Sequence, residues 1–318
     1  MNKKGVFFTY MAVFLIILIV AVVSTKDKYR YREKSNAISA RIKTINSFIG
    51  DFEKDLDREL FIGGYRALLS MNAYVRIIEG YVDDFDSIFT EIIVNGSMNG
   101  TSLDLMTQGA QGADITSWLT RTNEEANKLN INLDLSVKNI YVQHVTPWDV
   151  LVTLNTTVYI EDGQGLASWT FDRIYTREFS ILGFEDPLYA VGTEDKVTNL
   201  INITPNSDFI DDATNDTAVL NEHLLNSYYI NSTDAPSFLM RFTGNLSPSP
   251  YGIESMVNLE DLDAQGIPLL ARSVVDYIYF GNATTTDKCN VTDMPDWFRI
   301  DDSSIDTYEV DRLTYNDC

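Results

Sequence analysis

An uncharged apolar run near the start of the chain limits what this protein can be. Residues 6–23 read VFFTYMAVFLIILIVAVV, which is 18 residues without a charge. A helix of ~20 apolar residues crosses the hydrocarbon core of a bilayer, so the run is just long enough. A cleaved secretory segment usually has a shorter apolar stretch of about 7–15 residues, and residues 22–24 match its small-residue cleavage site poorly. The run therefore predicts a retained transmembrane anchor in residues 1–24, with a cleaved signal as the alternative.

The basic residues that flank this run favour a cytoplasmic location for its C-terminal side. Lys3 and Lys4 precede it, whereas five basic residues follow it, namely Lys26, Lys28, Arg30, Arg32 and Lys34. Counting positive charges alone would place the C-terminal side in the cytoplasm. Large domains, however, cross membranes largely regardless of such counts. The basic stretch is then expected to form a solvated collar against anionic lipid or a cell-surface polymer.

The remainder of the chain favours a location outside the cytoplasm. Its residues after position 50 hold 15 Lys and Arg against 44 Asp and Glu, and such an acidic body repels nucleic acid backbones. Nine N-x-Ser/Thr sequons occur in it, and glycosylation at sequons requires exposure on the exported side. We therefore expect a single-pass protein of the cell membrane with an extracellular body. The sequons are at Asn95, Asn99, Asn155, Asn202, Asn215, Asn231, Asn245, Asn282 and Asn290.

The first residues carry a resemblance. Asn2-Lys3-Lys4-Gly5 followed directly by a hydrophobic helix resembles the class III signal of type IV pilins and archaeal pilin-like proteins. The resemblance implies cleavage after Gly5, with Val6 as the mature N-terminus and the apolar helix as an assembly core. At the fifth mature position, where the family often has Glu, this chain has Tyr10. The rest resembles uncharacterised archaeal surface proteins, through residues 183–189 (GFEDPLY) and 251–255 (YGIES).

Helical periodicity continues beyond the apolar run. Its apolar residues recur at spacings of three and four, which predicts that the anchor helix extends to about residue 60. Gly63-Gly64 is expected to break it, and a second amphipathic stretch follows over residues 65–92. A shorter helix is expected over 114–129, with Asp114 as its N-cap. The seam residues are Ile38, Ile42, Ile45, Ile49, Phe52, Leu56 and Leu60.

The period then changes to two, which is typical of strands. Residues 131–138, 150–160 and 166–181 alternate apolar and polar side chains, and short turns at 146–149 and 161–165 join them. Three such strands predict an antiparallel meander. A long helix packed on a meander is the pilin-like arrangement, so the predicted fold class is α+β and pilin-like over residues 25–198.

A polar, turn-rich stretch at 199–216 predicts a linker to a smaller C-terminal α+β domain, residues 217–318. In that domain residues 218–229 are expected to be helical, and 238–242, 253–259 and 273–280 to be strands or buried segments. The two cysteines, Cys289 and Cys318, allow one disulfide, and an exported body favours it over two free thiols.

Chemical motifs are sparse. His144 and His223 are the two histidines, and neither adjoins a catalytic motif. No cofactor is predicted, and calcium is the one ligand that the sequence suggests. Asp211, Asn215 and Glu222 match positions 1, 5 and 12 of an EF-hand loop, but Ala213 and Asp216 occupy positions 3 and 6. A second acidic cluster has a solvated surface as its alternative; it contains Asp293, Asp296, Asp301, Asp302 and Asp306.

The sequence thus favours a surface-displayed structural or adhesive protein over an enzyme. Its expected partners are the membrane, further copies through the N-terminal helix, and surface glycans or other surface proteins, but no nucleic acid. The alternative is a membrane-tethered extracellular hydrolase with a pair of carboxylates, as in glycosidases. A third hypothesis, a solute-binding receptor, needs a cleft between two domains.

Overall fold

The computed structural model describes residues 3–107, 112–211, 214–281, 288–310 and 315–316. Two compact units result, each built from several segments. Unit 1 comprises Met1–Leu56, Thr122–Leu135 and Val158–Phe171, and unit 2 comprises Asp57–Arg121, Ser136–Thr157 and Asp172–Cys318. This division differs from the expected one, since the long helix and the three-stranded sheet each contribute to both units.

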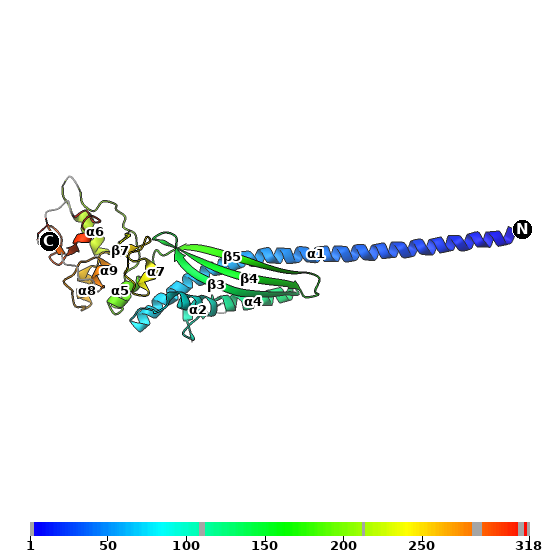
Figure 1. Ribbon diagram of the computed structural model, residues 1–318, viewed down its shortest axis with the longest axis horizontal. Coiled ribbons are helices and arrows are strands. Elements are labelled where there is room, and N and C mark those ends of the chain that lie inside the picture. The colour runs from blue at the N-terminus through cyan, green and yellow to red at the C-terminus, as the bar shows by residue number, and fades with distance from the viewer. Residues whose placement is uncertain (1–2, 108–111, 212–213, 282–287, 311–314, 317–318) are drawn as a thin grey trace. The chain divides into compact units, whose positions relative to one another are not determined.

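The N-terminal helix α1, Lys3–Ile78, is 76 residues long and is the blue helix of Figure 1. Among the described residues it is the one helix long and apolar enough to cross a membrane, with a mean hydropathy of 2.7 in its most apolar window. The expected continuation beyond the apolar run is confirmed. Of its predicted seam residues, Ile45, Phe52, Leu56 and Leu60 are at most 2% exposed, whereas Ile49 is half-buried and Ile38 and Ile42 are exposed.

The expected break at Gly63-Gly64 is wrong, because α1 runs through both glycines. They serve close packing within unit 2. A Cβ on Gly64 would lie 2.8 Å from Val152 Cγ2, and one on Gly63 would lie 2.9 Å from the Ala113 carbonyl oxygen. Glycine costs about 1 kcal/mol in a helix relative to alanine, and here that cost is offset by the approach of α1 to the sheet.

Helix α1 ends at Ile78, and the second amphipathic stretch is therefore divided between two helices. Helix α2, Phe85–Asn95, is capped by Asp84, whose side chain accepts a hydrogen bond from Ser87 N, and it ends at Gly96 in the left-handed region. A small hairpin and a short helix follow, comprising β1 (Ser97–Met98), β2 (Thr101–Ser102) and α3 (Asp104–Thr107).

Helix α4, Ile115–Lys128, confirms the expected helix and its cap. Ser117 N donates to Asp114 Oδ1 over 2.8 Å, which satisfies one of the free amides at the helix start.

The expected three-stranded meander is present. Strands β3 (Ile131–His144), β4 (Asp149–Asp162) and β5 (Ser168–Ser180) pair in the order β3-β4-β5 and lie side by side in Figure 1. Backbone hydrogen bonds close both hairpins, from Val145 N to Asp149 O and from Asp162 N to Ala167 O. Five apolar residues of β4 are fully buried, as the alternation over residues 150–160 predicts for one face of the strand: Val150, Val152, Leu154, Val158 and Ile160.

Aromatic packing joins the sheet to α1 within unit 2. Tyr65 of α1 packs edge-on against Phe179 of β5 and Phe184, with ring centroids 5.6 and 4.8 Å apart. Within unit 1, Arg41 of α1 forms an ion pair with Asp162 and donates from Nη2 to the Asn130 carbonyl oxygen over 2.7 Å.

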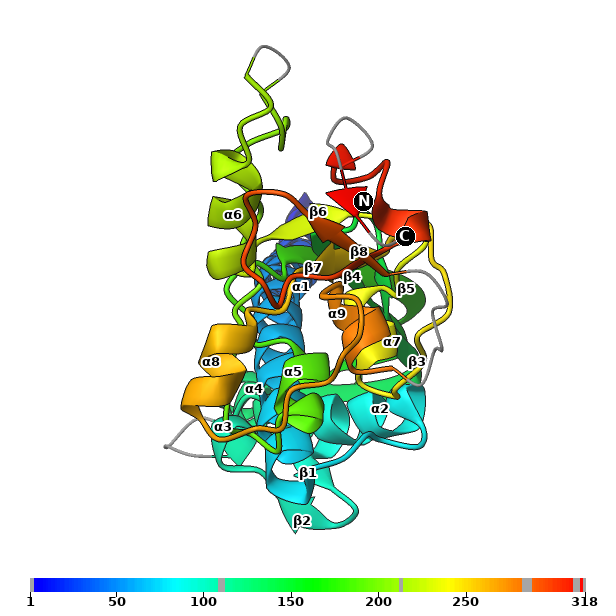
Figure 2. The ribbon, with the colours of Figure 1, turned by 90° about the vertical axis from the view of Figure 1, so that its left-hand side faces the viewer.

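The C-terminal part of unit 2 consists of short elements around a common core. Residues 199–216, expected as a linker, contribute the buried side chains of Ile201, Phe209 and Ile210. Helices α5, α7 and α9 lie close together beside β7 in Figures 1 and 2. The elements are α5 (Pro187–Gly192), α6 (Ala218–Leu225), β6 (Tyr229–Asn231), α7 (Phe238–Arg241), β7 (Ile253–Ser255), α8 (Leu259–Ala264), α9 (Asp276–Tyr279), β8 (Lys288–Val291), β9 (Ile300–Asp301), the 3-10 turn η1 (Asp302–Ser304) and β10 (Tyr315–Asn316).

Candidate functional site: an exposed apolar helix and a buried charge network

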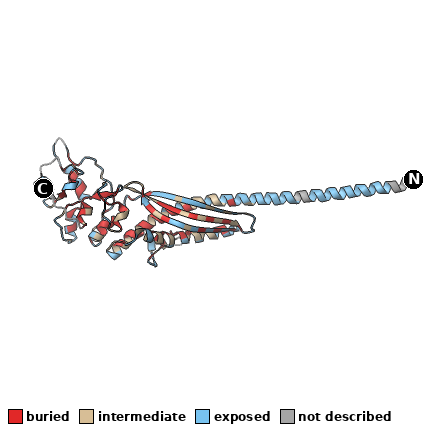
Figure 3. Ribbon diagram, viewed as in Figure 1, coloured by how far each residue is buried: buried red, intermediate tan, exposed pale blue. Residues whose placement is uncertain are grey.

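The surface of α1 changes character along its length. Between Phe7 and Val23 every large apolar side chain is at least half exposed, and Figure 3 draws this part of the helix as continuously exposed. Apolar residues occur on all sides here, so no single stripe could pack against the rest of the chain. A helix that is apolar all round requires lipid or other helices as its surroundings.

Basic side chains follow the apolar segment directly. Lys26, Arg30, Arg32 and Lys34 are exposed on the same helix, and Tyr31 beside them is 74% exposed. At 100° per residue Lys26, Arg30 and Lys34 lie within an arc of about 80°, and Arg32 lies on the opposite side of the helix. Basic side chains next to an apolar helix segment, with an aromatic residue among them, suit the headgroup layer that borders the membrane core.

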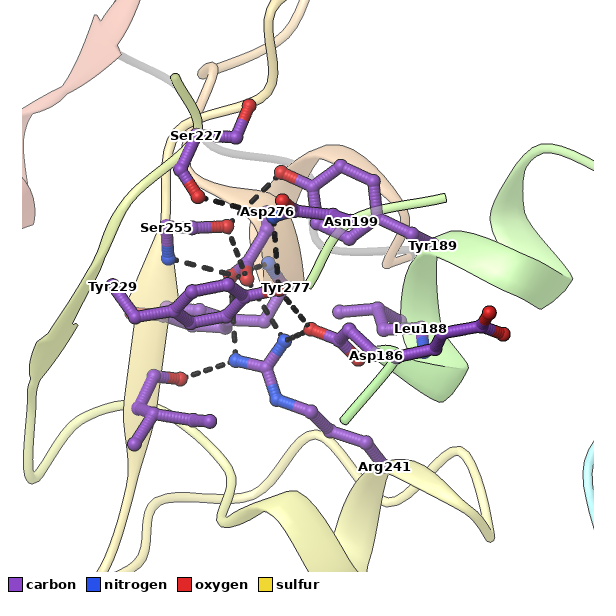
Figure 4. A network of polar contacts seen from close by, with 12 residues as sticks. Asp186, Leu188, Tyr189, Asn199, Ser227, Tyr229, Arg241, Ser255, Asp276 and Tyr277 are labelled. Carbon is purple, nitrogen blue, oxygen red and sulfur yellow. Dashed lines mark hydrogen bonds and ion pairs between the residues drawn. The ribbon is translucent and has the colours of Figure 1, made fainter. Parts of the chain in front are cut away.

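A second unusual feature lies inside unit 2, where Arg241 is completely buried (Figure 4). Its Nη1 lies 2.6 Å from Asp186 Oδ2 and 2.8 Å from Asp276 Oδ2, and its Nη2 donates to the Ile253 carbonyl oxygen. The short helices position this network: Asp186 caps α5, Arg241 ends α7, and Asp276 begins α9.

Neutral groups complete the network. Tyr229 donates from its hydroxyl to Asp186 Oδ2 over 2.7 Å, and Ser255 donates from Oγ to Asp276 Oδ2 over 2.9 Å. The Tyr189 hydroxyl lies 3.0 Å from Ser255 Oγ. Leu188 N donates to Asp186 Oδ1 and Tyr277 N to Asp276 Oδ1. All four carboxylate oxygens therefore have a donor, which a buried ion pair requires in order to persist.

Electrostatics in this network follow from burial and from the excess of one carboxylate. Burial raises the pKa of Asp276, and the adjacent Arg241 opposes that shift. Burial also lowers the pKa of Arg241, but the two carboxylates outweigh it and the net shift is upward. Arg241 thus stays charged. Asp186 and Asp276 both pair with Arg241 in the interior of the protein. A glycosidase pair of carboxylates would instead face a cleft that admits the substrate.

Burial shifts the pKa values of two further groups in opposite directions. Burial raises the pKa of Glu254 to about 7, with Asp276 as a further cause. Burial lowers the pKa of His223 to about 4, since its ring lies among Phe209, Tyr228 and Tyr308. The other histidine, His144, holds the turn after β3: its Nδ1 lies 3.1 Å from the Thr146 carbonyl oxygen, and Leu239 N donates to its Nε2.

One residue of the second expected acidic cluster, Asp301, has a structural role. Asp301 accepts hydrogen bonds from Ser273 and Ser304, over 2.7 and 2.9 Å, and so joins β9 to its neighbours. No group of three or more His, Cys, Asp or Glu in the described ranges could hold a metal ion. Residues 212–213 of the EF-hand-like segment lie outside those ranges.

Several predicted positions can be located. The asparagines at 95, 99, 202, 215, 231 and 245 are exposed, and Asn155 is half-buried on the outer face of β4. Asn282 lies outside the described residues, and only the backbone of Asn290 is described, in β8. Cys318 also lies outside them, so the disulfide with Cys289 stays a prediction. Gly5 and Val6 lie in the first turns of α1, where only the backbone is described.

Sequence reasoning did not identify the Arg241 network. Its three charged residues are 35 and 55 positions from one another in the chain, and no spacing motif joins them. One signal was present: Arg241 interrupts the apolar run Phe238-Leu-Met-Arg-Phe242. Two segments singled out in the sequence also supply network residues: Asp186 and Tyr189 lie in residues 183–189, and Ser255 lies in residues 251–255.

Comparisons with known proteins return nothing: no protein-family model, no curated protein and no solved structure matches the chain.

Proposed function

We propose that this protein is a membrane-anchored structural or adhesive protein of the cell surface. The exposed apolar segment of α1 carries the proposal. Burial of apolar surface is worth about 25 cal/mol per Å², so a helix segment that exposes 17 consecutive uncharged residues is not stable in water. A bilayer around residues 7–23 would remove this surface from water.

The body is proposed to lie outside the cytoplasm. Six sequon asparagines are exposed where a glycan has room, and the acidic composition suits a hydrated outer surface. The basic segment at residues 26–34 would then contact anionic headgroups on the outer leaflet.

Within this function, a pilin-like role is a separate proposal. The class III signal resemblance at Gly5 and the packing of α1 on the β3-β4-β5 sheet both support it. Cleavage after Gly5 would make Val6 the N-terminus, and the apolar helices of several copies could associate with one another in place of lipid. Surface glycans or other surface proteins would be the partners of the body.

Protease treatment of intact cells tests the location. We expect the protein in the membrane fraction, and added protease should remove residues beyond about 45, where the helix becomes part of the folded body. Protection of the body in intact cells, with digestion only after lysis, would refute the outside location.

Mass spectrometry of the N-terminus then separates the versions of the proposal. A start at Val6 supports pilin-type processing, and Gly5→Val should abolish it. A start at Met1 leaves a plain anchor. A start near Thr25 would mean that the apolar segment is removed and would refute anchoring.

A further inference from the structure

The hairpin that bears one sequon borders an apolar groove. A cavity of about 490 Å³ lies between the end of α1 and the β1–β2 hairpin, and a second of about 290 Å³ adjoins the same residues. Tyr74 and Asn99 line both cavities, and we call them together the Asn99 groove. Volumes of about 300–1,000 Å³ are typical of ligand sites.

The groove exposes apolar surface that needs an occupant. Ile77 is 79% exposed, Leu105 is 46% exposed and Ile78 is 41% exposed. These residues lie in unit 2 and are not part of the apolar segment that we assign to the membrane. Clustered exposed apolar side chains of this kind mark surfaces that bind something.

The asparagine in this groove is held rigidly. Asn99 and Gly100 form the two-residue turn of the hairpin, both in the left-handed region with φ of 49° and 74°, as Asn-Gly turns favour. Glu91 of α2 accepts hydrogen bonds from Asn99 N, Gly100 N and Ser97 Oγ over 2.9–3.0 Å. These bonds lower the pKa of Glu91, with the Gly100 amide as the largest cause. The turn therefore keeps one geometry.

The sequon itself is accessible. The side chains of Asn99 and Thr101, which supply the acceptor nitrogen and the required hydroxyl, are both exposed. A glycan attached to Asn99 would begin at the wall of the groove, because Asn99 lines both cavities.

We propose that an N-linked glycan on Asn99 occupies this groove and covers its apolar wall. Sugar rings have apolar C–H faces that pack on aromatic rings such as that of Tyr74, and hydroxyls that can donate to the rim carboxylates of Asp83, Asp84 and Asp104. A second copy of the chain fits less well, because the acidic rim would repel its acidic body. The inference rests on the proposed outside location.

A matched pair of variants tests this in full-length protein from the native host. Thr101→Ser keeps the sequon, whereas Thr101→Ala destroys it, and the two differ by one oxygen atom. Glycopeptide mass spectrometry measures occupancy of Asn99. Hydroxyl-radical footprinting in washed membranes measures the exposure of Tyr74, Ile77 and Leu105, and the buried Leu68 reports whether the fold is intact.

We expect an occupied Asn99 in Thr101→Ser, and a severalfold gain in labelling of the groove residues in Thr101→Ala with Leu68 unchanged. A bare Asn99 would overturn the inference. An occupied Asn99 with equally high labelling of the groove residues in both variants would also overturn it, since the glycan would then extend into solvent. Equally low labelling in both variants would identify another occupant, such as lipid or a second copy, and would likewise overturn it.

Occupancy elsewhere separates this inference from the proposed location. If Asn202 and Asn245, which are exposed and line neither cavity, carry glycans while Asn99 does not, only the groove assignment fails. If no sequon is occupied and the body resists protease on intact cells, the outside location itself fails.

Discussion

Two parts of the helix α1 differ in how far their apolar side chains are buried within the chain. Residues 7–23 are apolar on every side and have no covering in the chain. Residues 45–75 are apolar along one seam, and Ile45, Leu56, Leu68 and Val75 on it are fully buried. A helix that is apolar on all sides needs an apolar environment such as lipid around it, whereas a helix with one apolar stripe needs only one element packed against that stripe.

The largest effect is expected in the seam. Leu68→Ala should destabilise the body by about 2–5 kcal/mol, because it leaves a cavity in a fully buried site. Unfolding in detergent can be followed by tryptophan fluorescence, since all four tryptophans lie outside α1. The control, Leu18→Ala in the exposed segment, should leave the transition unchanged. Equal effects of the two changes would contradict the contrast.

A charge introduced into the apolar segment at residues 7–23 should weaken insertion into the membrane without changing the stability of the body. Leu15→Arg places a cation near the middle of the apolar run, at a cost to insertion of about 3 kcal/mol. We expect a lower fraction of the protein in the membrane pellet, with an unchanged fluorescence transition. Ile42→Arg, an exposed position beyond the run, is the control. Full membrane retention of Leu15→Arg would count against a spanning role.

Replacing two glycines of α1 with alanine should change the free energy of unfolding in opposite directions. A Cβ at Gly64 meets Val152 and Phe179, so Gly64→Ala should lose about 1–3 kcal/mol of stability through overpacking. Gly50 has nothing within 4 Å of the corresponding position, and Gly50→Ala should gain up to about 1 kcal/mol through helix propensity. Denaturant midpoints check both. Stabilisation by both changes would show that α1 does not need its close approach to the sheet.

The smallest effect is expected from charge at the end of α1. Arg76 pairs with Glu185 and Asp195, at 3.0 and 2.5 Å, but its side chain is 39% exposed. The Asp195 hydrogen bond is the largest cause that raises the pKa of Arg76. Arg76→Gln should cost less than about 1 kcal/mol, and the cost should shrink in high salt. A loss comparable with that of Leu68→Ala would mean that charge, not packing, holds this part of the helix.

How far the sequence predicts this molecule depends on whether the signal is local. The apolar run, the seam, the Asp114 cap and the meander were all predictable, because period and capping act within a few residues. Gly63-Gly64 misled the prediction because helix propensity is a weak term that tertiary packing overrides. Residues 238–242 and 273–280 were expected to be strands or buried segments. They are largely buried but contain the short helices α7 and α9, and runs this short cannot be assigned by periodicity.

The functional features divide in the same way. The anchor and the sequons could be identified from local patterns. The Arg241 network could not, because Asp186, Arg241 and Asp276 meet only through the tertiary fold. The Asn99 groove likewise depends on how the hairpin meets the end of α1, which no local pattern encodes.

The buried Glu254 and His223 have a consequence for proton linkage. Glu254 has its pKa raised from 4.5 to about 7, so its contribution to stability is present at low pH and is lost as the pH rises through that interval. His223 has its pKa lowered from 6.5 to about 4, so its contribution is present above 6.5 and is lost as the pH falls. Each shift corresponds to roughly 3 kcal/mol.

Where these intervals overlap, the two groups compensate each other. Between pH 4.5 and 6.5 the folded protein holds its proton on Glu254, whereas the unfolded chain holds one on His223. Unfolding then moves a proton from one group to the other without net uptake or release by this pair. Between about pH 4.5 and 6.5 the burial of these two groups therefore leaves the stability of the body independent of pH, as far as this pair contributes to it.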